Sequence, residues 1–241
     1  MKQPLENSPA FPPRLLEILT QRLHSLGFNI KEPLLRGWLF HQPETDTAIM
    51  VDHQVCDRNY PYSYTEYTKE QNGLMHRHAR LFRMLVDDQD ELEQEWTLLQ
   101  SYLNRDFSED EIKAGGNRAL SEIDPTLPEA HFEQAFIECY GREALDRVAR
   151  ELPMIDIHGQ TRWIDYYLQR AGVCDVAIEK NGETYHHPII TGKLQYRRQL
   201  VKQNSLAAYG VKVFRWSLEG MRFVENFHEE LKRFLGPVES F

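Results

Sequence analysis

The C-terminal half of the sequence alternates helix-forming and strand-forming segments in an order that strongly restricts its fold. The strand candidates are 154–157, 162–168, 173–179 and 211–216, and the helix candidates are 129–150, 194–208 and 218–235. Short polar turns at 158–160 and 169–172 favour hairpins between the first three strands. The resulting order, αβββαβα, predicts an α/β domain over residues 129–241.

The N-terminal half, residues 1–128, is harder to interpret. Leucines at helical spacing predict a first helix over 14–26, and residues 34–67 favour short strands or loops. Residues 74–103 have a helical pattern, as one helix or two, and Ser108–Glu111 has the form of a capping box before another short helix. Glycines and prolines between 115 and 128 indicate a linker, and no internal repeat is visible. We therefore expect a mainly helical N-terminal domain.

Composition excludes several classes of protein. The chain is 41% hydrophobic and 27% charged, as in ordinary globular proteins, and it has no apolar run of membrane-spanning length. The first residues lack the apolar region of a secretory signal, so we expect a cytoplasmic protein. Cys56, Cys139 and Cys174 are far apart and form no CxxC pair, which argues against a disulfide framework or a cysteine zinc site.

The net charge of −9 is unevenly distributed. Residues 1–128 carry 13 Lys and Arg against 21 Asp and Glu, whereas residues 129–241 carry 15 against 16. A local basic patch in the second half can still bind a polyanion. The basic residues Lys193, Arg197, Arg198 and Lys202 are the candidates for phosphate contacts. The acidic run 87–95 either shields such a site by mimicking phosphates or, the favoured alternative, is a solvated helix face.

Two carboxylates in neighbouring strands are the strongest chemical signal. Asp165 lies inside an aromatic strand, where an acid is costly unless it is paired, and Glu179 lies in the next strand. Close carboxylates repel each other unless a cation lies between them, and oxygen ligands with room for water suit Mg²⁺. A hairpin centred on Gly172 places the two acids opposite each other, about 5 Å apart at Cβ. A turn centred between 170 and 171 would instead offset them by roughly 10 Å.

These residues resemble a known family. The αβββαβ order, with Asp165 on the second strand and Glu179 on the third, is similar to the PD-(D/E)XK nuclease superfamily, which has a restriction-endonuclease-like core. The segment Ile178–His186 resembles the very-short-patch-repair-like endonucleases, in which I-E-x-D-G precedes a histidine. The segments 202–206 and 210–216 continue the match, so the resemblance covers about residues 129–235.

The resemblance implies roles for individual residues. Asp165, Glu179 and the backbone carbonyl of Lys180 would bind Mg²⁺ or Mn²⁺, and Glu133 would match an additional helix acid of the family. His186 would contact the scissile phosphate or move a proton. Asn181 stands where the superfamily usually has a lysine that orients water or stabilises charge. Each has a plainer alternative, since Glu133 can be a solvated helix residue and His186 a surface loop residue.

The sequence therefore predicts a metal-dependent deoxyribonuclease, most simply an endonuclease in DNA defence, repair or transposition. Its expected partner is DNA, with no membrane, and dimer formation is compatible with the sequence. One alternative is a degenerate nuclease fold that binds nucleic acid or a protein without cleaving, which the missing lysine at Asn181 permits. Another is a subunit that is active only in a larger assembly, with the acidic N-terminal domain contacting a protein partner.

Overall fold

The computed structural model describes residues 11–58, 63–104, 128–170, 173–181 and 187–237. The N-terminal half contains α1 (Pro13–Ser25), β1 (Asn29–Pro33), β2 (Gly37–Gln42), β3 (Thr47–Asp52), α2 (Tyr64–Arg77), β4 (Arg80–Leu85) and α3 (Gln89–Asn104). The C-terminal half contains α5 (Pro128–Tyr140), α6 (Arg142–Leu145), β5 (Ala149–Ile155), β6 (Thr161–Leu168), β7 (Val176–Asn181), α8 (Pro188–Ala208), β8 (Lys212–Ser217), α9 (Leu218–Arg222) and α10 (Val224–Leu235). No helix in these ranges is long and apolar enough to cross a bilayer.

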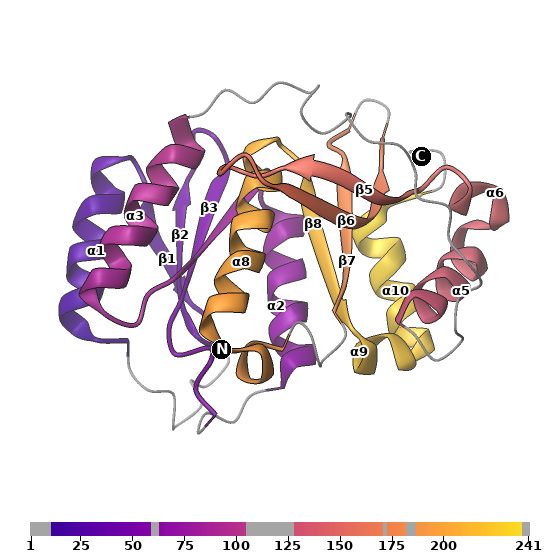
Figure 1. The fold of residues 1–241 in the computed structure, drawn as a ribbon, viewed down its shortest axis with the longest axis horizontal. Helices are drawn as coiled ribbons and strands as arrows, with labels where there is room; N and C mark the ends of the chain where they lie inside the picture. The colour runs from indigo at the N-terminus through magenta and orange to yellow at the C-terminus, as the bar shows by residue number, and fades with distance from the viewer. Residues whose placement is uncertain (1–10, 59–62, 105–127, 171–172, 182–186, 238–241) are drawn as a thin grey trace.

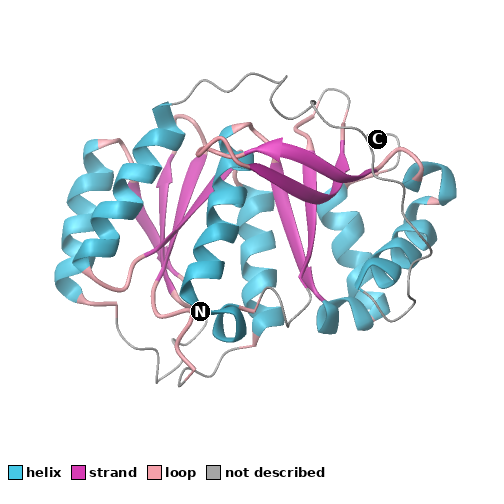
Figure 2. Ribbon diagram, in the orientation of Figure 1, coloured by secondary structure: helices cyan, strands magenta, loops and turns pink. Residues whose placement is uncertain are grey.

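The chain forms two four-stranded sheets with helices between and outside them (Figures 1 and 2). One sheet has the order β1-β2-β3-β4 and the other β5-β6-β7-β8. Helices α2 and α8 lie between the sheets, α1 and α3 cover the outer face of the first, and α5 and α10 cover the outer face of the second. The predicted α/β class is confirmed by these mixed sheets.

The two halves have the same topology. In each sheet the first three strands pair antiparallel, and the fourth returns through a crossover helix to pair parallel with the third. An outer helix precedes and another follows each sheet. The described fold is therefore a structural duplication of one αβββαβα unit, although the sequence predicted no internal repeat.

The crossover helices and the strands that follow them retain traces of this duplication in sequence. Gln71-Asn72 in α2 corresponds to Gln203-Asn204 in α8, and Phe82-Arg83 in β4 corresponds to Phe214-Arg215 in β8. The same spacing separates the helix pair from the strand pair in both halves. Few other positions are identical, which explains why the repeat is not obvious in the sequence.

The crossover helix of each half packs mainly against the sheet of the other half. Helix α2 packs mainly on β8, and α8 packs mainly on β4. The side-chain amide of Asn72 accepts from the backbone N–H of Arg215 at 2.8 Å and donates to its carbonyl at 2.7 Å. Asn204 makes the same two bonds with Arg83, at 2.8 and 2.7 Å. Two edge strands are thus closed by asparagines from the opposite half.

The core crosses the expected domain boundary. The larger buried cluster contains Tyr67 and Leu74 of α2 together with Ile178 of β7 and Phe214 of β8. A boundary at residue 128 separates the two sheets, but α2 and α8 are each packed against the sheet of the other half. The two halves consequently share this larger cluster.

The described part of the N-terminal half contains the helices α1, α2 and α3, but it also forms a four-stranded sheet that the expectation of a mainly helical domain did not include. Residues 80–85, expected within a helix, form β4, and the helix α2 begins at Tyr64, where strands or loops were expected. Strand β4 is buried after its first residue, as is the whole of β3, because helices cover both faces of the sheet. Such strands lose the polar alternation that marks a half-exposed strand. The expected helix after Ser108 and the linker lie outside the described residues.

The C-terminal elements agree more closely with expectation. The first helix ends at Tyr140, and the strand expected at 154–157 is longer and begins at Ala149. Helix α8 starts at Pro188 and contains a non-helical residue, Gly192, with φ of 76°. The helix predicted over 218–235 is divided into α9 and α10 at Phe223. Within α10, the apolar residues Phe227, Leu231, Phe234 and Leu235 are buried as predicted, and Gly236 ends the helix with positive φ.

Candidate active site

The acid pair lies where β6 and β7 run side by side. The ladder pairs Tyr166 with Ile178 and Leu168 with Val176, the register expected for a turn centred on position 172. Continued by one pair, this register places Asp165 opposite Glu179. The alternative turn, which would offset the acids by roughly 10 Å, is excluded. Both side chains belong to the sheet face that is turned toward α8.

Specific contacts hold each carboxylate. The Oδ2 atom of Asp165 accepts the backbone N–H of Lys180 at 2.9 Å. Glu179 is 2% exposed, and its carboxylate lies 2.6 Å from the ammonium of Lys202, which reaches across from α8. The acid pair therefore has the ammonium of Lys202 beside it. These contacts fit a site that favours a cation.

The raised pKa of Asp165 also indicates a site that favours a cation. Burial and the nearby Glu179 raise the pKa of Asp165 to about 6, against the opposing influence of Lys202 and Lys180. A carboxyl with such a pKa is held close to another negative charge in a poorly hydrated place. A divalent cation between the two acids would relieve that repulsion.

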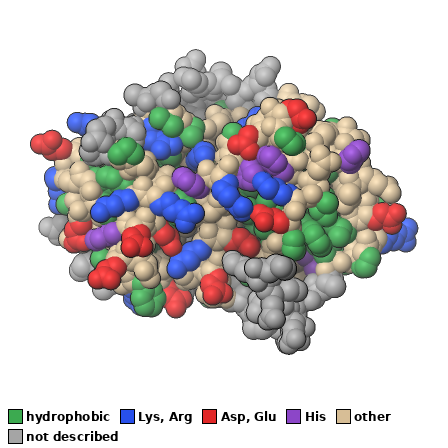
Figure 3. All heavy atoms as spheres, turned by 180° about the vertical axis from the view of Figure 1, so that it is seen from behind, with side chains coloured by type: hydrophobic (Ala, Val, Ile, Leu, Met, Phe, Trp, Pro, Cys, Tyr) green, Lys and Arg blue, Asp and Glu red, His purple; other side chains and the backbone are tan. Residues whose placement is uncertain are grey.

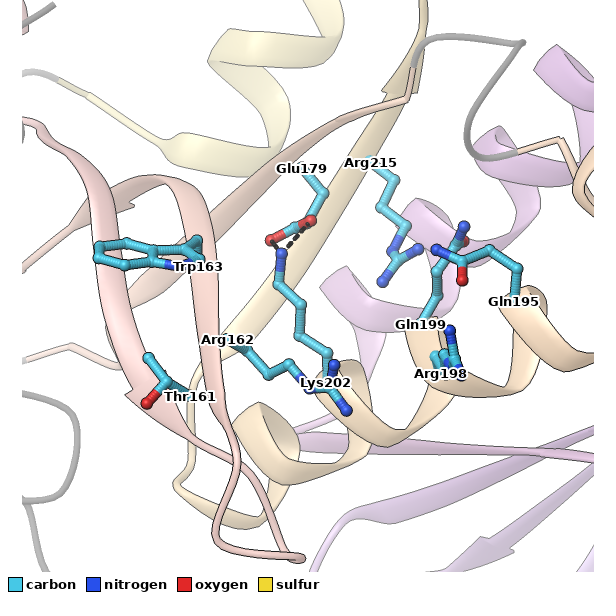
Figure 4. Close-up of a pocket in the computed structure, with 9 residues that line it drawn as sticks. All are labelled: Thr161, Arg162, Trp163, Glu179, Gln195, Arg198, Gln199, Lys202 and Arg215. Atoms are coloured by element: carbon cyan, nitrogen blue, oxygen red, sulfur yellow. Dashed lines mark hydrogen bonds and ion pairs between the residues drawn. The ribbon is translucent and has the colours of Figure 1, made fainter.

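A pocket of about 350 Å³ opens beside Glu179, between β6 and α8 (Figure 4). Its lining includes four cationic side chains and one acid. In Figure 4, Lys202 extends from α8 to Glu179, Trp163 stands on the strand side, and Arg198 stands on the helix side. The lining residues are Thr161, Arg162, Trp163, Glu179, Gln195, Arg198, Gln199, Lys202 and Arg215. An excess of positive charge in a cavity suits an anionic ligand such as a phosphodiester.

Two of the pocket arginines were not predicted as site residues. Arg215 is 4% exposed, and within the described part of the chain its Nε atom has no hydrogen-bond partner. The Nε atom of Arg162 donates to Asp156 at 2.7 Å. The period of two along β8 offered a signal for Arg215, since it pairs with Glu179 across the parallel ladder. It offered none for Arg162, which has the opposite parity to Asp165 on β6. Strand parity alone did not show which side chain would enter a pocket.

The four predicted phosphate-binding residues divide into two groups. Arg198 is exposed at the pocket, and Lys202 contacts Glu179. Lys193 instead forms ion pairs with Asp87 at 2.6 Å and Glu91 at 2.5 Å.

Arg197 also turns toward the acidic run, with its guanidinium 3.0 Å from Glu91 and 3.7 Å from Glu95. Burial raises the pKa of Glu95 to about 7, although Arg197 opposes the rise. The favoured interpretation of residues 87–95 as a solvated helix face holds for only part of the run, because Asp87, Glu91 and Glu95 neutralise the basic start of α8. On the face in Figure 3, basic and acidic side chains are likewise interspersed.

Glu133 lies on the other face of the same sheet and does not join the acid pair. Its carboxylate accepts from the Tyr166 hydroxyl at 2.8 Å and from Arg150 at 2.9 Å. The side chain of Lys180 is on this far face as well, paired with Glu129 and lying 5.4 Å from the Tyr166 ring centre. The structure therefore separates Glu133 from Asp165 and Glu179 by the thickness of the sheet.

The remaining predicted residues are only partly described. Asn181 ends β7 and pairs with Ser217 along the backbone, whereas its side chain and all of His186 lie outside the described residues. His187 caps α8, since its Nδ1 atom accepts the N–H of Ile189 at 3.2 Å, and its ring packs 4.9 Å from that of Tyr64.

The N-terminal half carries no acid pair at the matching positions. Aligning the ladders pairs Leu39 with Asp165 and Met50 with Glu179, and both N-terminal residues are fully buried. A cluster of His41, Asp46 and His78 elsewhere in this half brings three metal-ligating groups together.

The duplication offers a structural explanation of that cluster. Asp46 matches Asp175 of the other half, whose carboxylate accepts from the Tyr167 hydroxyl at 2.6 Å just as Asp46 contacts His41 at 3.0 Å. Tyr167 matches His41 in the aligned ladders. In each half, this aspartate therefore contacts a ring on the neighbouring strand of the hairpin, His41 in the first half and Tyr167 in the second.

Comparisons with protein-family models, curated proteins and solved structures found no match to this chain. The function proposed below therefore rests on the geometry and chemistry of its own residues.

Proposed function

We propose that this protein is a metal-dependent nuclease that hydrolyses DNA phosphodiester bonds, acting as an endonuclease in cytoplasmic DNA defence, repair or transposition. The observation that carries the proposal is the pair Asp165 and Glu179, opposite each other on neighbouring strands and next to a pocket rich in positive charge. Carboxylates for a hard cation beside cations for a phosphate are the two requirements of metal-assisted phosphodiester hydrolysis.

The donor set fits Mg²⁺ or Mn²⁺. Asp165 and Glu179 supply carboxylate oxygens, and the backbone carbonyl of Lys180 is the third protein ligand suggested by the family resemblance. Bound Mg²⁺ would lower the pKa of a water ligand and neutralise charge on the phosphate. Burial and Glu179 raise the pKa of Asp165 to about 6, and this carboxyl must lose its proton to bind a cation, so metal binding should strengthen as the pH rises toward and past about 6.

Lys202 offers a substitute for the lysine that the family usually has at position 181. Its ammonium is already at the acid pair, 2.6 Å from Glu179. With Glu179 holding a metal, this ammonium would be available to donate to a non-bridging phosphate oxygen and to stabilise the charge that develops there. Arg198 and Arg215 would hold the same phosphate from the helix side and the strand side of the pocket.

A binding module without catalysis is the second candidate, and the same ion pair favours it. With Lys202 neutralising Glu179, the acid pair already has a permanent cation in place of a metal. The ion pairs between Lys193 and residues Asp87 and Glu91 also leave fewer cations for DNA, which suits a subunit that needs a partner.

The test is cleavage of supercoiled plasmid and of single-stranded DNA by the purified chain in Mg²⁺, Mn²⁺ or EDTA. We expect cutting that requires metal and that falls to the EDTA level in Asp165→Asn and in Glu179→Gln. These isosteric changes remove charge with little change of volume, so loss of activity would report on the carboxylates.

Glu225→Gln provides the matched control, because it removes an exposed carboxylate on α10. This variant should cut like the wild type. Equal cutting by all three variants would contradict the assignment of the acid pair. Wild-type chain that binds DNA but cuts it in no metal would favour the binding module.

A further inference from the structure

Trp163 differs from the other tryptophans of the chain in its exposure to solvent. Its side chain is 47% exposed, whereas Trp216 is 3% exposed and Trp38 and Trp96 are half-buried. It precedes Asp165 by two residues on β6, so both side chains leave the same face of the strand, about 7 Å apart along it. Trp163 also forms the strand-side wall of the cationic pocket (Figure 4).

The duplication shows that the fold does not need this side chain. In the aligned ladders, Gly37 of β2 occupies the position of Trp163. A Cβ atom on Gly37 would lie 1.7 Å from the carbonyl oxygen of Val51, so the N-terminal half has no room for any side chain there. The same strand forms without an aromatic residue, and Trp163 is therefore not required to build the unit.

The surroundings of Trp163 suit one nucleotide. Arg198 and Lys202 of α8 and Arg215 of β8 supply positive charge for a phosphate in the pocket, and the indole offers a flat apolar face next to it. Aromatic side chains beside a positively charged groove bind single-stranded nucleic acid by stacking on bases, with little dependence on sequence. A base inside a duplex is already stacked on both faces and must leave the stack to meet such a platform.

We propose that Trp163 stacks on the base of the nucleotide whose phosphate enters the pocket, and that the substrate strand is unpaired at this nucleotide. The inference rests on the proposed function and deepens it, because it names the substrate class as single-stranded or locally unpaired DNA. Trp163 is a binding residue here, and it takes no part in the proton or phosphate chemistry.

The experiment measures binding of a fluorescein-labelled 12-nucleotide oligothymidylate, and of a blunt duplex of mixed sequence, in EDTA by fluorescence anisotropy. Trp163→Ala should weaken single-strand binding about tenfold, and Trp163→Phe should retain most of it because a phenyl ring still stacks. Duplex binding should be weaker and should change less than about twofold in either variant.

Phe223→Ala is the matched control, since Phe223 is 60% exposed at the junction of α9 and α10 and does not line the pocket. It should bind like the wild type. The proposal is overturned if Trp163→Ala binds the single strand as tightly as the wild type, if duplex binding falls equally, or if the wild type binds no single strand. Thermal unfolding of each variant checks that the fold is retained.

The outcomes separate this inference from the nuclease assignment. Single-strand binding that depends on Trp163, without cleavage in any metal, would support the stacking role and contradict the nuclease. Cleavage that depends on Asp165 and Glu179 but is indifferent to Trp163 would do the reverse.

Discussion

The two halves of this molecule have the same topology but differ in polarity at one pair of matching strand positions. The strands β6 and β7 carry Asp165 and Glu179, and the matching positions of β2 and β3 carry Leu39 and Met50. Both sets face the middle layer of helices. The unit therefore folds with either an acid pair or an apolar pair at this point, which shows that the acids are not needed for the fold.

The matching arginines show the same contrast. Arg83 is 1% exposed, and its guanidinium donates to Asp52 at 2.9 Å, Gln71 at 3.1 Å and Gln203 at 3.0 Å. Arg215 lines the pocket instead. One arginine is anchored to a buried carboxylate in the core, and the other is placed beside an acid pair where an anion can reach it.

The largest expected effect separates these two arginines. Arg83→Met leaves Asp52 buried beside tyrosine hydroxyls without its cation, and we expect the free energy of unfolding to fall by about 3–5 kcal/mol. Arg215→Met should cost less than half as much. Urea unfolding at pH 7 measures both, and equal losses would break the proposed division into a structural and a binding arginine.

The asparagines test the duplication itself. Asn72→Ala and Asn204→Ala each remove two hydrogen bonds to an edge strand of the opposite half. Each should lower the free energy of unfolding by about 2 kcal/mol, because a buried N–H and C=O lose their partner. Urea unfolding of the two variants should agree within about 1 kcal/mol. A large loss in one variant alone would show that the two halves do not share equivalent interfaces.

The smallest effect concerns Asp165 and has a defined pH dependence. Its folded-state pKa, about 6, is above the ordinary value of 3.8, so its ionisation destabilises the folded state as the pH rises from about 4 through 6. Asp165→Asn removes that cost and should raise the free energy of unfolding at pH 7.5 by about 1 kcal/mol.

Thermal unfolding at several pH values checks this prediction. The gain in Asp165→Asn should shrink as the pH falls and vanish near pH 4, where the wild-type carboxyl is protonated. The control Glu225→Gln should show no such trend. A gain that is constant with pH would mean that the acid pair is not strained by its own charge.

The residues of the acid pair were predictable because their signals are local. An acid within a β-prone aromatic segment and a second acid 14 positions later specify a hairpin register once the turn is placed. The apolar spacing of helix α10 and its end at Gly236 were equally predictable, because both signals are local. Its start at Val224 was not, since no side-chain cap marks it. The position of Glu133 was not predictable, because the residue pattern of α5 does not show which face of the sheet this helix covers.

Strand β4 and the duplication were not predictable in the same way. The segment Arg80–Leu85 is buried on both faces and has no period of two, so it merged with the helical patterns on either side. The exchange of α2 and α8 between halves depends on contacts between residues more than 100 positions apart, such as Asn72 with Arg215.

The sequence by itself determined the αβββαβα order of the second half, because periodicity acts over a few residues. It left two hairpin registers for Asp165 and Glu179, and the structure has the one centred on position 172. Only the tertiary structure decided which cations remain for a ligand. Lys193 and Arg197 are neutralised by acids about 100 residues earlier in the chain, whereas Arg198, Lys202 and Arg215 converge on one pocket. Charge neutralisation depends on distance in space, and the packing of α3 and α8 sets that distance.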